Sequence, residues 1–169
     1  DGMRSVYAKF ADEAGNESEV FTDKILLDRQ APIGSITINN ADESSTDVKT
    51  ELQISYGDAK QMMVSHMPTF NHAIWSAPSS TLPWQFNGLD GTKSIYLKLI
   101  DEAGNESEVF SDSIWIDTEA PIVRSVMIDN GISAVKAGKK VMLQSKVMNA
   151  DFMMISNTPD FASATWEPF

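Results

Sequence analysis

The feature that most constrains the fold of this chain is a ten-residue string, DEAGNESEVF, which occurs at residues 12–21 and again at residues 101–110. The offset is 101 − 12 = 89 residues, and in this register residues 1–33 match residues 90–122 at 21 of 33 positions. An internal repeat of this length is the signature of structural units arranged in series. We therefore predict copies of one module with a period of about 89 residues.

The other half of the module also recurs, but less strictly. Residues 35–40, SITINN, resemble residues 125–130, SVMIDN, and the Met pair at residues 62–63 returns at residues 153–154, an offset of 153 − 62 = 91. The small drift indicates insertions in loops. We expect three parts: the C-terminal part of one repeat at residues 1–31, a complete repeat at residues 32–120, and the N-terminal part of a further repeat at residues 121–169.

Apolar residues alternate with other residues along much of the module. Ile95, Leu97 and Leu99 occupy every second position before the turn at residues 103–105. Such alternation is typical of half-buried antiparallel strands, and no 3.6-residue stripe with helix caps appears. About seven short strands in about 89 residues predict an all-β Greek-key sandwich. Strands are expected at residues 20–28, 33–38, 48–56, 61–66, 74–75, 84–86 and 109–117.

Three segments together carry a family likeness. Residues 90–98 (DGTKSIYLK), 101–107 (DEAGNES) and 116–121 (IDTEAP) resemble the bacterial Ig-like, fibronectin type III-like repeats of large surface and adhesin-type proteins. Residues 75–78 and 166–169 look like the Trp-x-Pro-aromatic element of the same family. The resemblance implies tandem Ig-like sandwiches, an extracellular location at the bacterial cell surface or in secreted proteins, and a structural or binding role.

The charge of the chain bears on its partners. The formal net charge is −11, so the surface repels the phosphates of nucleic acid and of anionic lipid, and we exclude those partners. The absence of cysteine excludes disulfides and thiolate metal sites. No apolar run approaches the roughly 20 residues needed to cross a bilayer, so we expect no membrane insertion in this segment.

Acidic residues near the strand ends suggest a calcium site, because Ca²⁺ takes about 6–8 oxygen ligands, many of them from carboxylates. Asp101 opens the DEAGNES loop, and Asp117 with Glu119 lies in the linker to the next repeat. Asp12 and Asp28 are the equivalent positions of the preceding repeat. Calcium at these residues would stiffen the joint between repeats. The alternative is that the aspartates cap turns by accepting backbone N–H bonds.

Catalytic chemistry has little support in the sequence. His66 and His72 are the only histidines, and neither recurs in the other copy. A hydrolytic triad needs a histidine held between a carboxylate and a nucleophile, and no Gly-rich phosphate loop is present. We expect no catalytic residues, no cofactor other than calcium, and no enzymatic activity.

Trp115 raises a ligand-binding hypothesis. It falls on the outward phase of its expected strand, where an indole ring could stack on a surface glycan, although Leu26 replaces it in the other copy. The competing interpretation is packing in the core or between repeats, because aromatic side chains dominate both environments.

Function follows from the arrangement of parts. Our main hypothesis is a structural module of a long extracellular stalk, adhesin shaft or fibre, whose partners are neighbouring repeats or head-to-tail copies of the same chain. The partial repeats carry open strand edges, which invite pairing. They are completed either by a continuing polypeptide or by strand complementation from another copy. The alternative is a carbohydrate- or ligand-binding sandwich of a secreted protein.

Overall fold

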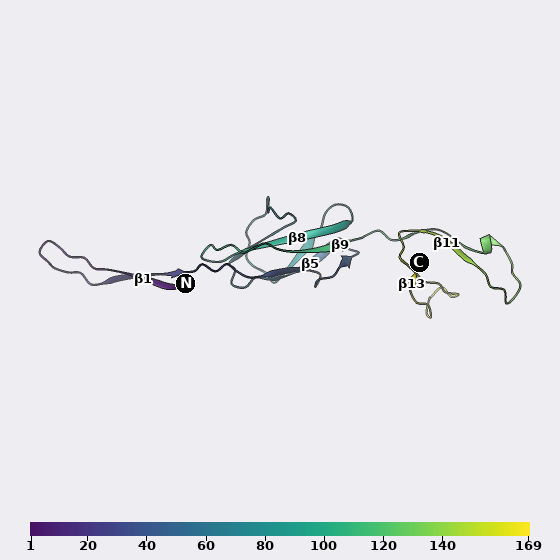
Figure 1. Cartoon of the computed structure of the whole chain (residues 1–169), viewed down its shortest axis with the longest axis horizontal. Coiled ribbons are helices and arrows are strands. Elements are labelled where there is room, and N and C mark those ends of the chain that lie inside the picture. The colour runs from purple at the N-terminus through teal and green to yellow at the C-terminus, as the bar shows by residue number, and fades with distance from the viewer. The chain divides into compact units, whose positions relative to one another are not determined.

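The computed structural model describes residues 1–169 and is built almost entirely from strands, with one 3₁₀ turn, Asp129–Gly131, and no α-helix. This confirms the all-β class that the alternation of apolar residues predicted. The chain divides into two compact units, Asp1–Thr118 and Glu119–Phe169, which are described separately below (Figure 1).

Two small sheets form a sandwich in the first unit, which we call the central sandwich. The strand order is β3-β5-β7 in one sheet and β4-β9-β8-β6 in the other, and all neighbours are antiparallel except β4 and β9. The bounds are β3 Ser35–Ile38, β4 Ser44–Ser45, β5 Lys49–Ser55, β6 Gln61–Ser65, β7 Thr81–Gln85, β8 Gly91–Ile100 and β9 Phe110–Ile116.

The core of the central sandwich follows from the period-two pattern. Along β8, Ile95, Leu97 and Leu99 are fully buried while the residues between them are only partly covered. Because successive side chains of a strand point to opposite faces, one face of each sheet meets the other sheet. The shared cluster comprises Ile36, Ile38, Leu52, Ile54, Met62, Phe86, Ile95, Leu97, Leu99, Ile114 and Ile116. Burying each such side chain contributes about 1.5–3 kcal/mol.

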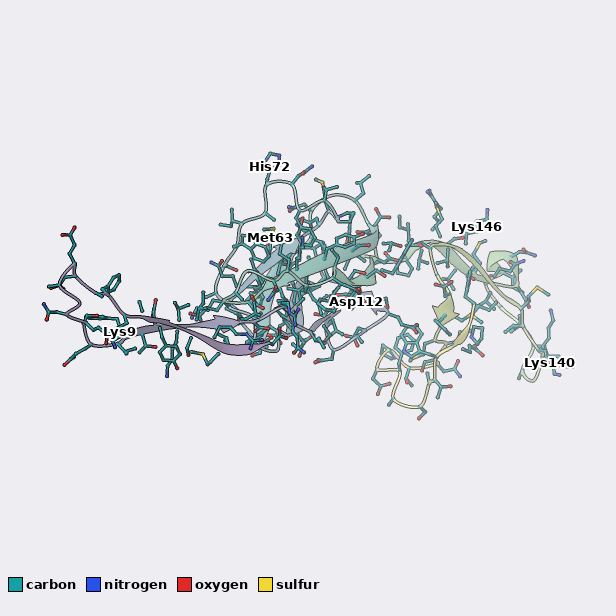
Figure 2. All side chains as sticks on the ribbon, turned by 60° about the vertical axis from the view of Figure 1, so that its left-hand side comes forward. Lys9, Met63, His72, Asp112, Lys140 and Lys146 are labelled. Carbon is teal, nitrogen blue, oxygen red and sulfur yellow. The ribbon has the colours of Figure 1, made fainter.

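A polar contact joins the two sheets at one edge. Asp112 lies on β9 (Figure 2). Its carboxylate accepts a hydrogen bond of 2.8 Å from the backbone N–H of Ile38, on β3. A backbone N–H at a sheet edge needs a partner when it is shielded from water. Asp112 therefore satisfies β3 from the opposite sheet and helps to hold the two sheets together.

The N-terminal residues form a separate two-stranded hairpin of β1, Gly2–Ala8, and β2, Phe21–Leu27. Its register runs from Gly2↔Leu27 to Ala8↔Phe21. The β8–β9 pair runs from Gly91↔Ile116 to Leu97↔Phe110, which is the same pairing displaced by 89 residues. The loop bridges, Ala11↔Glu17 and Ile100↔Glu106, also differ by 89.

The second unit consists of two separate strand pairs. β10, Ile122–Ile128, pairs with β11, Leu143–Met148, and β12, Phe152–Met153, pairs with β13, Glu167–Pro168. The pairing of β10 shifts register between Val123 and Ser125, and then continues as Ser125↔Lys146 and Val126↔Ser145. This later stretch matches Ser35↔Ser55 and Ile36↔Ile54 of the central sandwich.

Most expected strands agree with the observed ones to within three residues, but one expected strand does not form and one observed strand was not expected. No strand forms at residues 74–75, where Ser76 makes only a single bridge to Met62, so that expectation was wrong. The two-residue strand β4, which runs parallel to β9, was not predicted. Two residues are too few to show an alternating pattern, and β4 is held only through its hydrogen bonds to β9.

Candidate functional site

The hairpin exposes an apolar surface that its counterpart in the central sandwich buries. We call Val6, Ala8, Phe10, Ile25 and Leu27 the hairpin face. Val6, Phe10 and Ile25 are 70%, 66% and 69% exposed, whereas their counterparts 89 residues later, Ile95, Leu99 and Ile114, are 0%, 0% and 1% exposed. The difference arises because the central sandwich covers its copy with a second sheet. An apolar surface of this kind marks an interaction site.

The second unit has a matching open cavity of about 470 Å³. Its lining is apolar and includes Val126, Leu143, Val147, Met153, Ile155 and Trp166. Val126 and Leu143 are exposed, whereas the residues at the same register positions of the central sandwich, Ile36 and Leu52, are buried. The cavity therefore occupies the place that core side chains fill in the central sandwich.

Strands β1 and β12 are shorter than β8 and β6, the strands at the equivalent positions of the central sandwich. β8 has ten residues and β1 has seven, so Lys9, Phe10 and Ala11 fall outside β1 while Lys98, Leu99 and Ile100 belong to β8. In the central sandwich these three residues pair with β6. The counterpart of β6 in the second unit, β12, has only two residues where β6 has five. Each strand stops where its pairing partner is missing.

The DEAGN loop is closed by its own side chains. Asp101 is buried, and its Oδ1 and Oδ2 accept hydrogen bonds from the backbone N–H and Nδ2 of Asn105, at 2.9 and 2.8 Å. The side-chain bond from Asn105 is the main cause that holds the pKa of Asp101 below its ordinary value, with backbone N–H bonds adding to the effect and burial opposing it. Asp12 makes the same two bonds with Asn16, and its pKa is lowered for the same first cause.

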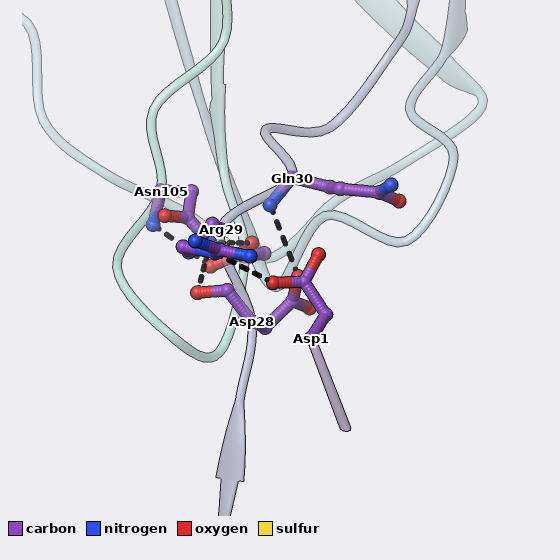
Figure 3. Close-up of polar contacts among 6 residues, drawn as sticks. Asp1, Asp28, Arg29, Gln30 and Asn105 are labelled. Carbon is purple, nitrogen blue, oxygen red and sulfur yellow. Dashed lines mark hydrogen bonds and ion pairs between the residues drawn. The ribbon is translucent and has the colours of Figure 1, made fainter.

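The residues of the calcium hypothesis are distributed over both units. Asn105 Nδ2 also donates to the backbone carbonyl of Asp28, at 3.3 Å, and Asp28 Oδ1 accepts from the Gln30 N–H (Figure 3). Asp117 lies in the first unit and Glu119 in the second. The structure gathers no three His, Cys, Asp or Glu side chains that could hold a metal ion. Calcium binding stays a prediction, and the turn-capping alternative accounts for the geometry of Asp101 and Asp12.

Trp115 lies on β9 between the buried Ile114 and Ile116, with its own side chain 52% exposed. It faces outward, as the alternation predicted, and its neighbours in register are Thr92 and Ser44. The glycan-stacking hypothesis for Trp115 stays a prediction.

A second hollow, of about 380 Å³, lies beside His66 and is lined mainly by polar residues, among them Asn87, Thr92 and Lys93. The His66 ring packs against Trp84 and Phe86, with centroids 4.8 and 5.8 Å apart. His66 is itself exposed, and its ring packs against the partly buried Trp84 and the buried Phe86 at the margin of the core. His72 lies in a loop with a positive φ of 65°.

No protein-family model matches the chain, and no curated protein matches it. None of its elements is a helix of the length and apolar character needed to span a bilayer.

Proposed function

We propose that this chain is a structural segment of a long extracellular bacterial array, such as a surface stalk, an adhesin shaft or a fibre. In this proposal, Ig-like Greek-key sandwiches follow one another with a period of about 89 residues. The observation that carries it is the recurrence of the same contacts at that spacing. The ion pair Lys9–Glu17 returns as Lys98–Glu106.

The front half of the module supports the same interpretation. In the central sandwich, Asn39 N–H donates to the Glu51 carbonyl, and Glu51 N–H donates back to Asn39 Oδ1. Asp129 and Met142 exchange the same two bonds in the second unit. Near the other end, Phe70 and Phe161 have φ angles of 54° and 53°. Similar contacts at similar spacing favour one module used more than once.

The strand order of the central sandwich supports the Ig-like assignment. Ig-like sandwiches place their first, second, fourth and fifth strands in one sheet and their third, sixth and seventh in the other. The fourth has no counterpart here, because no strand forms between β6 and β7. β3, β5 and β7 share one sheet here, and β6, β8 and β9 share the other. The short β4, which follows the first strand along the chain, pairs with β9 in the other sheet.

The filled interior of the central sandwich and its proline-containing linkers favour a structural role. Its interior is filled by the side chains of both sheets. The linkers Ala31-Pro32 and Ala120-Pro121 restrict the joints, because proline fixes φ. Such modules act as spacers whose length grows with their number, and the proposal assigns no catalytic step to these residues.

Surface labelling tests the proposal. An antibody raised against the 169-residue chain should label intact cells of the organism that makes the protein, and mild external protease should remove the label. Labelling that appears only after the cells are lysed would contradict the extracellular assignment. A cytoplasmic protein of known abundance serves as the control for cell integrity.

The exposed Trp115 supports glycan binding as a second candidate function. Its indole lies on the solvent face of β9, within reach of the polar side chain of Thr92. A glycan array probed with the native chain and with Trp115→Ala tests it. Binding that the substitution abolishes supports this candidate, and an array without binding contradicts it.

A further inference from the structure

We propose that the hollow beside His66 binds an acidic saccharide, a sugar chain in which one ring carries a carboxylate or a sulfate group. We call this space of about 380 Å³ the polar hollow. Its polar lining comprises His66, Asn87, Thr92, Lys93, Ser94 and Tyr96. The inference goes beyond the structural role proposed above. It rests on the second candidate function, glycan binding, and names the class of sugar and a further part of its site.

The polar hollow lies where β8 extends past the end of β6. β6 ends at Ser65, which pairs with Tyr96, whereas β8 begins at Gly91. Over residues 91–95, β8 therefore pairs on one side only, with β9. The chain leaves the sheet after Ser65, and the space beside this part of β8 stays open. The polar hollow is thus formed by the strand lengths of the closed central sandwich.

The lining of the polar hollow offers hydrogen-bond donors and no carboxylate. Its hydroxyl, amide, imidazole and ammonium groups can each donate to a ligand oxygen. Residues 32–118 as a whole carry four Lys and Arg against twelve Asp and Glu, a net charge of 4 − 12 = −8. Because like charges repel, an anionic group is repelled by most of this surface. In the polar hollow it meets a lysine with no carboxylate among the lining residues.

Lys93 supplies the positive charge of the polar hollow. Its Nζ donates to the backbone carbonyls of Asn87 and Leu89, at 3.3 and 2.5 Å. Both acceptors are uncharged, so these bonds position the ammonium group without neutralising it. An ammonium group has three N–H donors, and the third is available to a ligand oxygen. A side chain that is already held in place loses less entropy when the ligand binds.

The aromatic side chains and the size of the polar hollow fit a sugar ring. The His66 ring is held against Trp84 and Phe86, and Tyr96 contributes a second ring to the lining. Aromatic rings with a polar group combine an apolar face with a hydrogen-bonding edge, as the C–H faces and hydroxyl groups of a sugar require. Ligand pockets measure roughly 300–1,000 Å³, so a hollow near the lower end of that range suits a single ring.

Trp115 places another ring next to the polar hollow. Thr92 lines the hollow and pairs with Trp115 across β8 and β9. Residues paired in this way have Cβ atoms about 4.5–5.5 Å apart. A saccharide of two or more rings can therefore place its acidic ring in the polar hollow and a neighbouring ring on the exposed indole of Trp115.

An array of oligosaccharides that bear uronate or sulfate groups, each beside its neutral counterpart, tests the class of ligand. The native chain should bind at least one acidic member at least tenfold more tightly than the neutral counterpart. Preference for uronate or for sulfate then identifies the acidic group. Binding to no acidic member, or equal binding to acidic and neutral members, would overturn the proposal. Inorganic sulfate that competes as well as the free saccharide would also overturn it, because the sugar would then contribute nothing.

Matched substitutions test the position of the site, with affinity for the acidic saccharide measured by calorimetry. Ser94→Glu adds a carboxylate to the polar hollow and should weaken binding at least tenfold. Thr81→Glu adds the same charge at an exposed position of β7, in the other sheet, and should change binding less than threefold. Equal effects of the two substitutions would overturn the proposal.

Lys93→Met repeats the test by removing a positive charge, so that the result does not depend on the folding of one variant. Its control is Lys60→Met, next to Gln61, which pairs with Ile100 at the other end of β8. Only Lys93→Met should weaken binding tenfold or more, and equal losses would contradict the site. Binding of glycans that Trp115→Ala abolishes but that Ser94→Glu and Lys93→Met leave unchanged would refute the polar hollow and leave the glycan-binding candidate standing.

Discussion

At the scale of single residues, burial depends on what covers a side chain as much as on the side chain itself. Leu52 is fully buried between two sheets, whereas Leu143, at the same register position of the second unit, is exposed. Both belong to strands with the same alternating pattern. The pattern predicts which face of a strand is apolar, and the neighbouring sheet decides whether that face is buried.

We expect Leu52→Ala to lower the free energy of unfolding of the central sandwich by about 2–5 kcal/mol, because it removes buried methyl groups and leaves a cavity. Leu143→Ala should change it by about 0.5 kcal/mol or less, as is usual for exposed positions. Urea denaturation followed by tryptophan fluorescence in a Trp166→Phe background measures both, since Trp75, Trp84 and Trp115 then report on the central sandwich. Equal losses would contradict the core assignment.

Asp101 links the stability of the central sandwich to pH. Its pKa is lowered in the folded state, chiefly by the Asn105 side chain, so its contribution is fully present above the pKa of the unfolded chain. That contribution is lost as the pH falls through the lower, folded-state pKa, in the range below about pH 4. Urea midpoints measured across this range should fall less steeply for Asp101→Asn than for the native chain. Parallel curves would show that the carboxylate is not coupled to folding.

At the scale of strands, the sequence predicted the strands in which apolar residues alternate with polar ones. It missed the strand that is held by hydrogen bonds to its neighbour. The strands at residues 48–56 and 109–117 were recognised because apolar residues recur at every second position. β4 depends on hydrogen bonds to β9 alone, and β1 is shorter than β8 although their sequences match. Strand length here is set by pairing partners, which a local pattern does not contain.

The candidate site shows the same limit. The sequence predicted open strand edges in residues 1–31 and 121–169, and the apolar faces of the hairpin and of the second unit are exposed in the structure. The sequence offered turn capping as one role of Asp101, but it did not identify Asn105 as the partner, because that partner is decided by the conformation of the loop. Acidic residues near strand ends fit both calcium binding and turn capping, so the sequence left both open.

The link between β3 and β9 gives a prediction at this scale. Asp112→Ala removes the acceptor of the Ile38 N–H and should lower the free energy of unfolding of the central sandwich by about 1–3 kcal/mol, because a partly buried donor loses its partner. Asp23→Ala, at the matching hairpin position, should leave that stability unchanged. Thermal unfolding of both variants checks the difference, and a neutral Asp112→Ala would show that the contact contributes nothing.

At the scale of the whole molecule, one closed sandwich shares its chain with a two-stranded hairpin and with a second unit of two separate strand pairs. Side chains from both sheets of the central sandwich form one shared core. The hairpin and the second unit consist of two-stranded sheets, and no further strands cover their apolar faces. An isolated hairpin is only marginally stable in water. Stability should therefore be concentrated in residues 32–118.

Amide hydrogen exchange, read by mass spectrometry on the intact chain at low concentration, tests this most directly. Residues 6–10 and 95–99 are a natural comparison, because they occupy equivalent positions of the two copies of the hairpin and only the second copy is covered by another sheet. We predict slow exchange in Ile95–Leu99 and fast exchange in Val6–Phe10. Equal protection of the two segments in the monomeric chain would contradict the account.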